Sequence, residues 1–276
     1  MTPTLEFLLP GDPATRTGGY AYDRRIVAGL QALGWTVRVH RLAASFPFPD
    51  RAALDDAATC FAALPDGALV VVDGLAYGAL PAIAAREAAR LRLVALVHHP
   101  LARESGLDEP ARVRLQASET EALRYARRVV VTGERTASDL AAWHVPRERI
   151  DVVPPGADRA PRARGSAPPA GDVATAVATS HEAVPTTLLC VATLTPRKGH
   201  DLLLDALAGV GTHAWRLVCV GSADRSPATA AELRAQATRL GLDAQVCWRG
   251  ELADADLAAA FDAADVFVLA AHHEGY

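Results

Sequence analysis

The stretch that decides the fold reads TLEFLLPGDPATRTGGYAYDRRIVAGLQALGWTVRVHRL, residues 4–42. Its first apolar run, residues 4–9, is typical of a buried strand. Residues 20–33 repeat apolar side chains at the spacing of one helix face, and Gly34 marks the end of that helix. A second strand is expected over residues 35–42. A strand, a helix and a strand of these lengths predict a βαβ unit, in which the two strands are parallel.

The same alternation covers most of the chain, which predicts an α/β protein with mostly parallel sheets. In the first half we expect further strands at residues 68–73, 92–98, 129–132 and 150–153, with helices at 50–64, 81–90, 108–127 and 134–143. In the second half we expect strands at residues 187–193, 215–220, 245–249 and 266–270, with helices at 199–207, 227–240 and 254–262.

A change of composition separates the two halves. Residues 154–185 are rich in Pro, Ala, Gly, Ser and Thr and lack an apolar period, which is typical of a linker or mobile loop. We therefore predict two Rossmann-like, doubly wound domains, over residues 1–155 and 187–276, joined by a linker over 156–186. The second domain ends shortly after a strand, without a helix to cover its sheet. We expect it to be incomplete, as in a fragment or the product of a truncated gene.

Composition restricts the class of protein. The chain has 28 basic and 32 acidic residues and a formal net charge of −4, which argues against a nucleic-acid-binding surface. It shows neither an apolar run long enough to span a membrane nor a basic leader before its first apolar run. The four cysteines are far apart and form no C-x-x-C pair, so we interpret them as free thiols of a cytoplasmic protein.

Lysine is used only once. Of the 28 basic residues, 27 are arginine, and the single lysine is Lys198. A lysine retained in such a chain can mark a position where a planar guanidinium would not serve as well as a compact ammonium. The alternative is that one lysine remained by chance.

Two glycines and a histidine follow strands of the first half, where ligands of parallel sheets bind. Gly18 and Gly19 open a helix, so the backbone can approach a ligand closely and the helix start favours an anion. Neither a G-x-G-x-x-G nor a P-loop motif is present. His98, in the run His98-His99-Pro100, can act as a base or donate to a sugar hydroxyl. The alternative for the two glycines is a flexible turn, and the alternative for His98 is a structural histidine.

Two cations occupy the corresponding place in the second half. Arg197 and Lys198 lie between a strand and a helix, a combination that suits a diphosphate, although a solvated basic turn is the alternative. The last strand is followed by His272-His273-Glu274, which suggests a metal site. Adjacent histidines rarely face one ion, however, and no H-E-x-x-H motif is present, so we expect no metal.

Taken in order, these motifs resemble those of the retaining glycosyltransferases of family 4, which have the two-domain GT-B fold. The resemblance covers nearly the whole chain and implies transfer of a sugar from a nucleotide-diphosphate sugar to an acceptor, with retention of anomeric configuration. The segments that carry it are Gly18-Gly19, His98-His99-Pro100, Val152-Val153-Pro154-Pro155-Gly156, Arg197-Lys198-Gly199 and Glu274-Gly275-Tyr276.

The resemblance also implies roles for individual residues. Arg197 and Lys198 would hold the diphosphate, as a divalent metal does elsewhere. Gly18 and Gly19 would line the opposite side of the cleft, near the phosphates and the acceptor. His98 would be the active-site histidine near the donor sugar. No cofactor is then needed beyond the donor substrate itself.

Three further residues complete the implied site. Gly250 and Glu251 would border the nucleobase, and Glu274 corresponds to the first glutamate of the E-x7-E motif, which contacts the donor sugar. The second glutamate of that motif would lie beyond Tyr276, so an inactive truncated remnant is one alternative function. A nucleotide-sugar epimerase or a phosphorylase is another, because both share the GT-B architecture.

The sequence leaves the sugar, the base and the acceptor open, and the acceptor can be a glycan, a lipid or a small molecule. Relatives that act at membranes often bear a basic face on the first domain. Arg124, Arg127 and Arg128 could contribute to such a face, and a solvated helix end is the alternative. We expect a nucleotide sugar as partner, no nucleic acid, and at most peripheral membrane contact.

Overall fold

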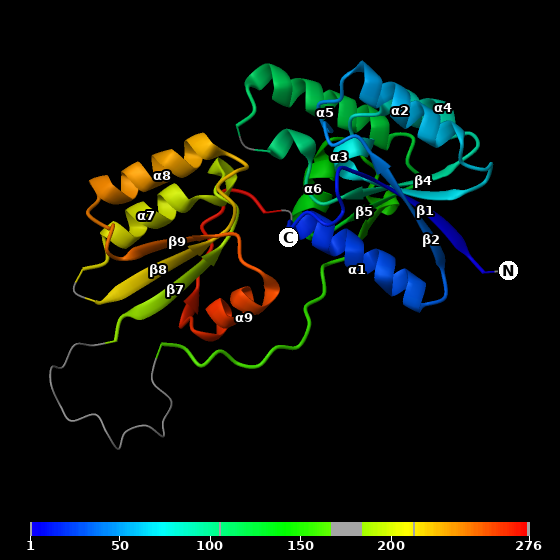
Figure 1. Cartoon of the computed structure of the whole chain (residues 1–276). Coiled ribbons are helices and arrows are strands. Elements are labelled where there is room, and N and C mark those ends of the chain that lie inside the picture. The colour runs from blue at the N-terminus through cyan, green and yellow to red at the C-terminus, as the bar shows by residue number, and fades with distance from the viewer. Residues whose placement is uncertain (1, 105, 167–183, 212, 275–276) are drawn as a thin grey trace, which may run out of the picture. The chain divides into compact units, whose positions relative to one another are not determined.

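The structure is a computed structural model that describes residues 2–104, 106–166, 184–211 and 213–274 (Figure 1). By their internal contacts the residues form two units, one of Met1–Ala157 with Glu274 and one of Asp158–His273. Each unit is built around its own parallel sheet, as the sequence predicts. Of the predicted linker, residues 167–183 lie outside the described residues. Just before them, the Ser166 amide donates to Asp265 of the second unit at 2.9 Å.

The first unit contains a six-stranded sheet in the order β2-β1-β3-β4-β5-β6, and neighbouring strands are parallel. From β1 the chain moves to β2 on one side and then crosses back to β3 on the other, so the order reverses between β1 and β3. In open α/β sheets, ligands bind at such a switch point, at the carboxyl ends of the strands. The strands are β1 (Thr4–Pro10), β2 (Thr36–Leu42), β3 (Leu69–Asp73), β4 (Arg92–Val97), β5 (Arg128–Val131) and β6 (Ile150–Val152).

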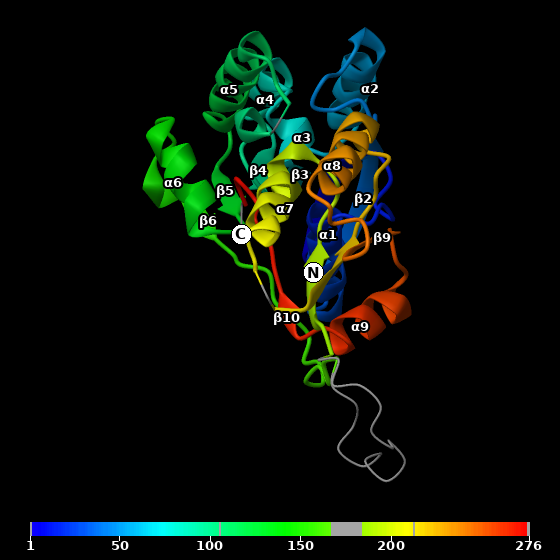
Figure 2. The ribbon, with the colours of Figure 1, turned by 90° about the vertical axis from the view of Figure 1, so that its left-hand side faces the viewer.

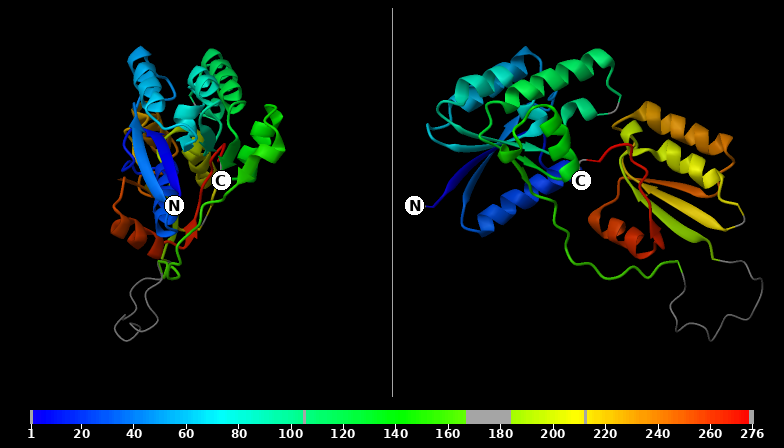
Figure 3. Two further views of the ribbon diagram at one scale, coloured as in Figure 1. Left: turned by 90° about the vertical axis from the view of Figure 1, so that its right-hand side faces the viewer. Right: turned by 180° about the vertical axis from the view of Figure 1, so that it is seen from behind.

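Helices cover both faces of this sheet (Figures 1 and 3). Helix α1 (Gly18–Ala32) packs Tyr22 against the face that carries Phe7, and the other helices cover the face that carries Leu8. Right-handed crossovers that run in opposite directions along a sheet place their helices on opposite faces, which explains the division. The helices on the second face are α2 (Arg51–Ala62), α4 (Pro81–Glu87), α5 (Glu109–Leu123) and α6 (Glu134–Ala142).

Three short helices in this unit were not predicted, because they are too short to show a periodic pattern. They are α3 (Gly74–Tyr77), η1 (Leu101–Arg103) and η2 (Arg147–Arg149). Helix α3 follows β3 without a loop, and Asp73 caps it by accepting a hydrogen bond from the Leu75 amide at 2.8 Å. This cap fixes the conformation of the chain where β3 passes into α3.

The second unit is smaller and contains a four-stranded parallel sheet in the order β10-β7-β8-β9. The chain moves from β7 outward to β9 and returns to β10 on the other side of β7, so the switch point lies between β7 and β10. Helices α7 and α8 cover one face and α9 covers the other (Figures 1 and 2). The elements are β7 (Thr186–Val191), η3 (Pro196–Lys198), α7 (His200–Ala208), β8 (Trp215–Val220), α8 (Pro227–Arg239), β9 (Val246–Gly250), α9 (Asp254–Asp262) and β10 (Val266–Phe267).

The predicted last strand, residues 266–270, is longer than the strand observed. Val266 and Phe267 pair with β7, and the Val268 amide makes one more bond to the Leu189 carbonyl. Beyond that point the chain leaves the ladder, and the His272 amide bonds instead to the Arg197 carbonyl. None of the described helices combines the length and the apolar character that crossing a bilayer requires.

Candidate active site

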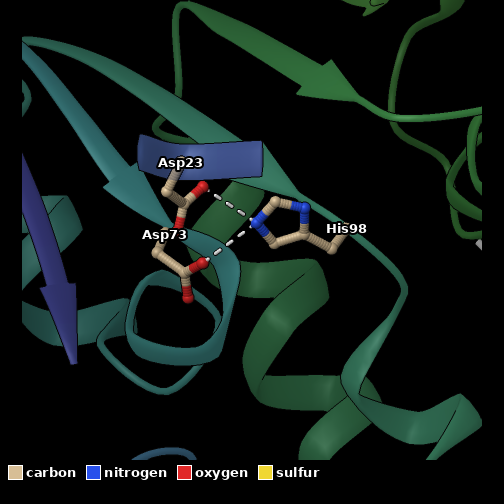
Figure 4. A group of neighbouring side chains, drawn as sticks. All are labelled: Asp23, Asp73 and His98. Carbon is tan, nitrogen blue, oxygen red and sulfur yellow. Dashed lines mark hydrogen bonds and ion pairs between the residues drawn. The ribbon is translucent and has the colours of Figure 1, made fainter. Parts of the chain in front are cut away.

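Three polar side chains converge at the β1/β3 switch point of the first unit (Figure 4). Asp23 comes from α1, Asp73 is the last residue of β3, and His98 directly follows β4. The Nε2 atom of His98 lies 3.0 Å from Oδ1 of Asp23 and 3.3 Å from Oδ2 of Asp73. The order of the strands thus brings together three residues that are far apart in the sequence.

Burial and charge oppose each other in this group. Asp23 and Asp73 each expose only 1% of their surface, and the side chain of His98 exposes 18%. Burial by itself lowers the pKa of His98, but the hydrogen bonds and charges of Asp23 and Asp73 outweigh it and raise that pKa to about 10. Burial raises the pKa of Asp23, and the charge of Asp73 raises it further, against the lowering effect of His98. His98 and Asp23 therefore keep their protons to higher pH than they would in water.

The His98 ring is fixed from further sides. It packs perpendicular to Tyr22, with ring centroids 5.5 Å apart and planes at 82°. A Cβ atom added to Gly19 would lie 3.3 Å from Cδ2 of His98, which is tighter than an ordinary contact. The carbonyl oxygen of His98 accepts a hydrogen bond from the Thr132 hydroxyl at 3.0 Å. Gly19, which the sequence singled out for close approach to a ligand, thus also makes room for the histidine.

Asp23, Asp73 and His98 also have the chemistry of a metal-ligand set, since their ligand atoms all lie within 4.8 Å of one another. The separations between Nε2 and the carboxylate oxygens are those of hydrogen bonds. We therefore interpret the group as a hydrogen-bonded ion triad. That the protein needs no metal stays a prediction.

In the second unit, the loops after β7 and β10 meet at the switch point. Arg197 donates a hydrogen bond from its guanidinium to the His273 carbonyl at 2.9 Å, and its own carbonyl accepts from the His272 amide at 2.9 Å. Lys198 is the next residue, the last of η3, directly before the Gly199 that begins α7. The predicted pair of cations does lie in front of a helix N-terminus, and Arg197 connects it to the segment that leads into Glu274.

Gly199 makes this junction possible. Its φ of +63° lies in the left-handed region, and a Cβ atom there would lie 2.0 Å from the Ala270 carbonyl oxygen. Behind it, His200 is 2% exposed, with Nε2 3.6 Å from the Cys190 sulfur. Burial lowers the pKa of His200 to about 4, with Asp201 opposing the shift and the charge of Lys198 adding to it. The imidazole under the turn is therefore neutral at neutral pH.

Two family models match the chain. The model described as glycosyl transferases group 1 matches residues 178–276, and the one described as glycosyltransferase family 4 matches residues 68–160. The first includes the Arg197–Lys198 turn, and the second includes Asp73 and His98. No curated protein matches the sequence.

Solved structures resemble the chain over nearly its whole length. Sucrose-phosphate synthase from Thermosynechococcus elongatus superposes with a TM-score of 0.70 and 18% identity, over 98% of this chain and 76% of its own. HepE from Anabaena, in complex with UDP and glucose, gives 0.63 and 18%, over 98% and 76%. The lipopolysaccharide outer core galactosyltransferase WaaB, in its apo form, gives 0.65 and 13%, over 99% and 75%. The fold is that of the GT-B glycosyltransferases. Together with the two family models, it supports a glycosyltransferase.

The other predicted site residues of this GT-B chain are divided between the two units. Gly250 ends β9 with a φ of +67°, and its carbonyl oxygen accepts a bond from the Gly221 amide at 2.8 Å. Glu251 follows it, and Glu274 follows His273 and is half-buried. Their contacts with a donor remain predictions. In the first unit, Gly18 starts α1 in open space, because a Cβ atom there would meet nothing within 4 Å.

Two of the three arginines considered for a membrane-facing surface, Arg124 and Arg128, form ion pairs with acids. Arg124 lies 3.0 Å from Glu121, and Arg128 forms an ion pair with Asp151. This favours the interpretation as a solvated helix end. Arg124 also lines a groove along α5, together with Thr120 and Trp143, and this groove was not predicted from the sequence.

Proposed function

We propose that this chain transfers a sugar from a nucleotide-diphosphate sugar to an acceptor, with retention of configuration at the anomeric carbon. The observation that carries the proposal is the turn of Arg197, Lys198 and Gly199 at the β7/β10 switch point. Two cations in front of the N-terminus of α7 form a site for a diphosphate, because the charges neutralise it and the free amides donate to it. The UDP complexes of the similar HepE structures support a nucleotide diphosphate as the ligand class.

The chemistry follows from the charges that the reaction creates. Cleavage of the sugar–phosphate bond develops positive charge on the sugar and negative charge on the leaving diphosphate. Fixed cations at Arg197 and Lys198 stabilise that leaving group, and one preorganised contact of this kind is worth roughly 3–4 kcal/mol. In our proposal the acceptor attacks from the face that the diphosphate leaves, and a departing phosphate oxygen takes the acceptor's proton.

The other predicted residues complete the proposal. Glu274 contacts the donor sugar, and Gly250 and Glu251 border the nucleobase. Gly18 and Gly19 leave room for the phosphates and the acceptor, and His98 faces the donor sugar. The two cations take the place of a divalent metal, so neither a metal nor a cofactor is required.

We place the reaction in the cytoplasm. The cysteines support this location, because Cys60, Cys190, Cys219 and Cys247 are all free thiols. Unpaired cysteines are typical of a reducing compartment.

Calorimetry with UDP, ADP and GDP tests the donor site. We expect one of these nucleotides to bind the chain, and we expect Lys198→Ala to weaken the affinity for that nucleotide at least tenfold. Arg239→Ala, which removes a cation at the far end of α8, is the matched control and should leave the affinity unchanged. If the nucleotides fail to bind, or bind equally to all three proteins, the proposed diphosphate site is wrong.

Product analysis tests the reaction. An α-linked donor should give an α-linked product in the presence of an acceptor, as read by NMR of the anomeric proton. A β-linked product would exclude retention. Conversion of the nucleotide sugar without any acceptor would favour an epimerase, and dependence on inorganic phosphate would favour a phosphorylase.

A further inference from the structure

One nitrogen of His98 faces two buried carboxyl groups. Both Asp23 and Asp73 lie within hydrogen-bond distance of Nε2. An ionised carboxylate only accepts hydrogen bonds, so Nε2 must carry a proton in order to make either contact. The other ring nitrogen, Nδ1, lies on the side of the ring that points away from the two carboxyl groups (Figure 4).

Among the residues that the structure describes, the other groups packed around His98 add no cation to this pair. From α1, Tyr22 contributes an aromatic ring whose hydroxyl donates to the Val153 carbonyl at 2.9 Å. The neighbouring His99 turns to Glu104, with Nε2 3.0 Å from its carboxylate. Near α6, the hydroxyls of Thr132 and Thr136 contact the His98 carbonyl oxygen rather than the ring. The charged groups that the structure places against the ring are therefore both carboxyl groups.

A buried carboxylate without a counter-charge is costly, and two of them side by side are more so. A second proton on the His98 ring supplies a positive charge next to the two carboxyl groups, and both carboxyl groups stabilise the charged ring. Burial opposes a charged imidazole, but the pKa of about 10 shows that the carboxyl groups outweigh burial.

We propose that Asp23 and Asp73 hold His98 as an imidazolium ion, so that its Nδ1–H acts as a fixed positive donor toward oxygen atoms of the donor substrate and His98 does not act as a base. We treat Asp23 as the positioning residue to be tested. Asp73 also caps α3, so its replacement affects that helix as well as His98. The role in the reaction rests on the proposed glycosyl transfer, whereas the charge on His98 does not. If His98 is an imidazolium ion, the acceptor's proton must go elsewhere, which agrees with its transfer to the leaving phosphate.

Nitrogen and carbon NMR of histidine-labelled full chain measures the charge directly. We expect the His98 ring, assigned by comparison with His98→Gln, to keep the shifts of an imidazolium ion from pH 6 to pH 8. In Asp23→Asn the apparent pKa should fall by at least one unit. Glu104→Gln, which removes the partner of His99, is the matched control and should leave the His98 titration unchanged.

A wild-type His98 that titrates near pH 6.5 would overturn the proposal without recourse to any variant. An unchanged His98 pKa in a folded Asp23→Asn protein would overturn the role of Asp23. If Asp23→Asn does not fold, Asp73→Asn provides the same comparison, with circular dichroism to confirm that its helices remain.

The pH dependence of turnover tests the role in the reaction. The pH profile of the wild-type kcat/KM should show no change due to titration of His98 between pH 6 and 8. Asp23→Asn should instead lose activity as the pH rises through its lowered His98 pKa. A wild-type profile in which activity requires deprotonation of His98 would show that it is a base. Absence of turnover with every nucleotide sugar would count against the proposed function, and the NMR titration would still decide the charge.

Discussion

Gly199 and Ala270 are in such close contact that no side chain fits between them: a Cβ atom on Gly199 would lie 2.0 Å from the Ala270 carbonyl oxygen. The contact joins the turn that carries Arg197 and Lys198 to the segment that follows β10. Because the obstacle is backbone, neither side can yield by a change of rotamer. The geometry of the proposed diphosphate site therefore depends on this glycine.

Gly199→Ala should disrupt the second unit, and Gly250→Ala is its matched control. Both glycines have a left-handed φ, +63° and +67°, but a Cβ atom on Gly250 would meet nothing within 4 Å. Gly250→Ala should cost only the left-handed strain, about 1–2 kcal/mol. Gly199→Ala should lower the free energy of unfolding, measured in urea, by clearly more. Equal losses of unfolding free energy in the two variants would show that the Gly199 turn and the segment at Ala270 can move apart to admit a side chain.

Lys198→Ala should reduce kcat/KM for the nucleotide sugar at least ~10²-fold, the scale of one lost contact to a developing charge. Lys198→Arg should restore only part of that loss, because a planar guanidinium and a compact ammonium differ in reach. Steady-state kinetics at saturating acceptor measures both. An alanine variant within threefold of the wild type would show that this lysine is only a surface residue.

Turnover should survive treatment with EDTA, since in our proposal Arg197 and Lys198 stabilise the diphosphate in place of a metal ion. The measurement compares initial rates before and after chelation and after Mg²⁺ or Mn²⁺ is added back. Loss of activity that either ion restores would contradict the prediction. It would also direct attention to Asp23, Asp73 and His98 as ligands.

Gly19→Ala should impair turnover about tenfold by pressing on the His98 ring, because small displacements of a site residue are costly. Gly18→Ala is the control in the same helical turn, where the added methyl group meets nothing within 4 Å. That control should lose less activity than Gly19→Ala, because its methyl group does not press on His98, and it should gain slightly in thermal stability, since alanine favours a helix more than glycine does. Similar activity of the two variants would mean that the ring has room to move.

Glu119 should make the first unit less stable as pH rises. It is buried in α5 and accepts a bond from the Leu101 amide at 2.8 Å, and burial raises its pKa to about 8, against the lowering effect of that bond. Its folded pKa thus exceeds the unfolded value, so the protonated form is favoured in the folded state and stability is lost between about pH 4.5 and 8.

Glu119→Gln removes this titration. The free energy of unfolding of the wild type should fall by ~3 kcal/mol relative to the variant between pH 4.5 and 7. Urea titrations at several pH values measure the difference. Parallel pH dependence of the two proteins would mean that the carboxyl group is already ionised in the folded state.

Local patterns predicted nearly all of the secondary structure, because periods of two and 3.6 residues are properties of short segments. Every expected strand is present, from β1 to β10. The main error, the length of the strand that begins at Val266, arose where a tertiary contact took over: the Arg197 carbonyl bonds to the His272 amide and draws the chain out of the ladder.

The site was predictable only in part. Gly19 and His98 follow strands and were found by that rule. Asp23 was missed because it precedes Arg24 and Arg25 on a helix, in a run that has the composition of a solvated face. Asp73 was counted as the end of a strand. That both face His98 depends on the order β1-β3-β4, which no local pattern contains.

The turn that follows β7 carries a side chain that can be labelled selectively. Because Lys198 is the only lysine of the chain, an amine-reactive acylating reagent has one side chain to modify besides the α-amino group. Each modification adds a single, separable increment of mass. A ligand that covers the turn slows the modification of Lys198. Mass spectrometry of the untagged protein can therefore rank nucleotides by the protection that they give.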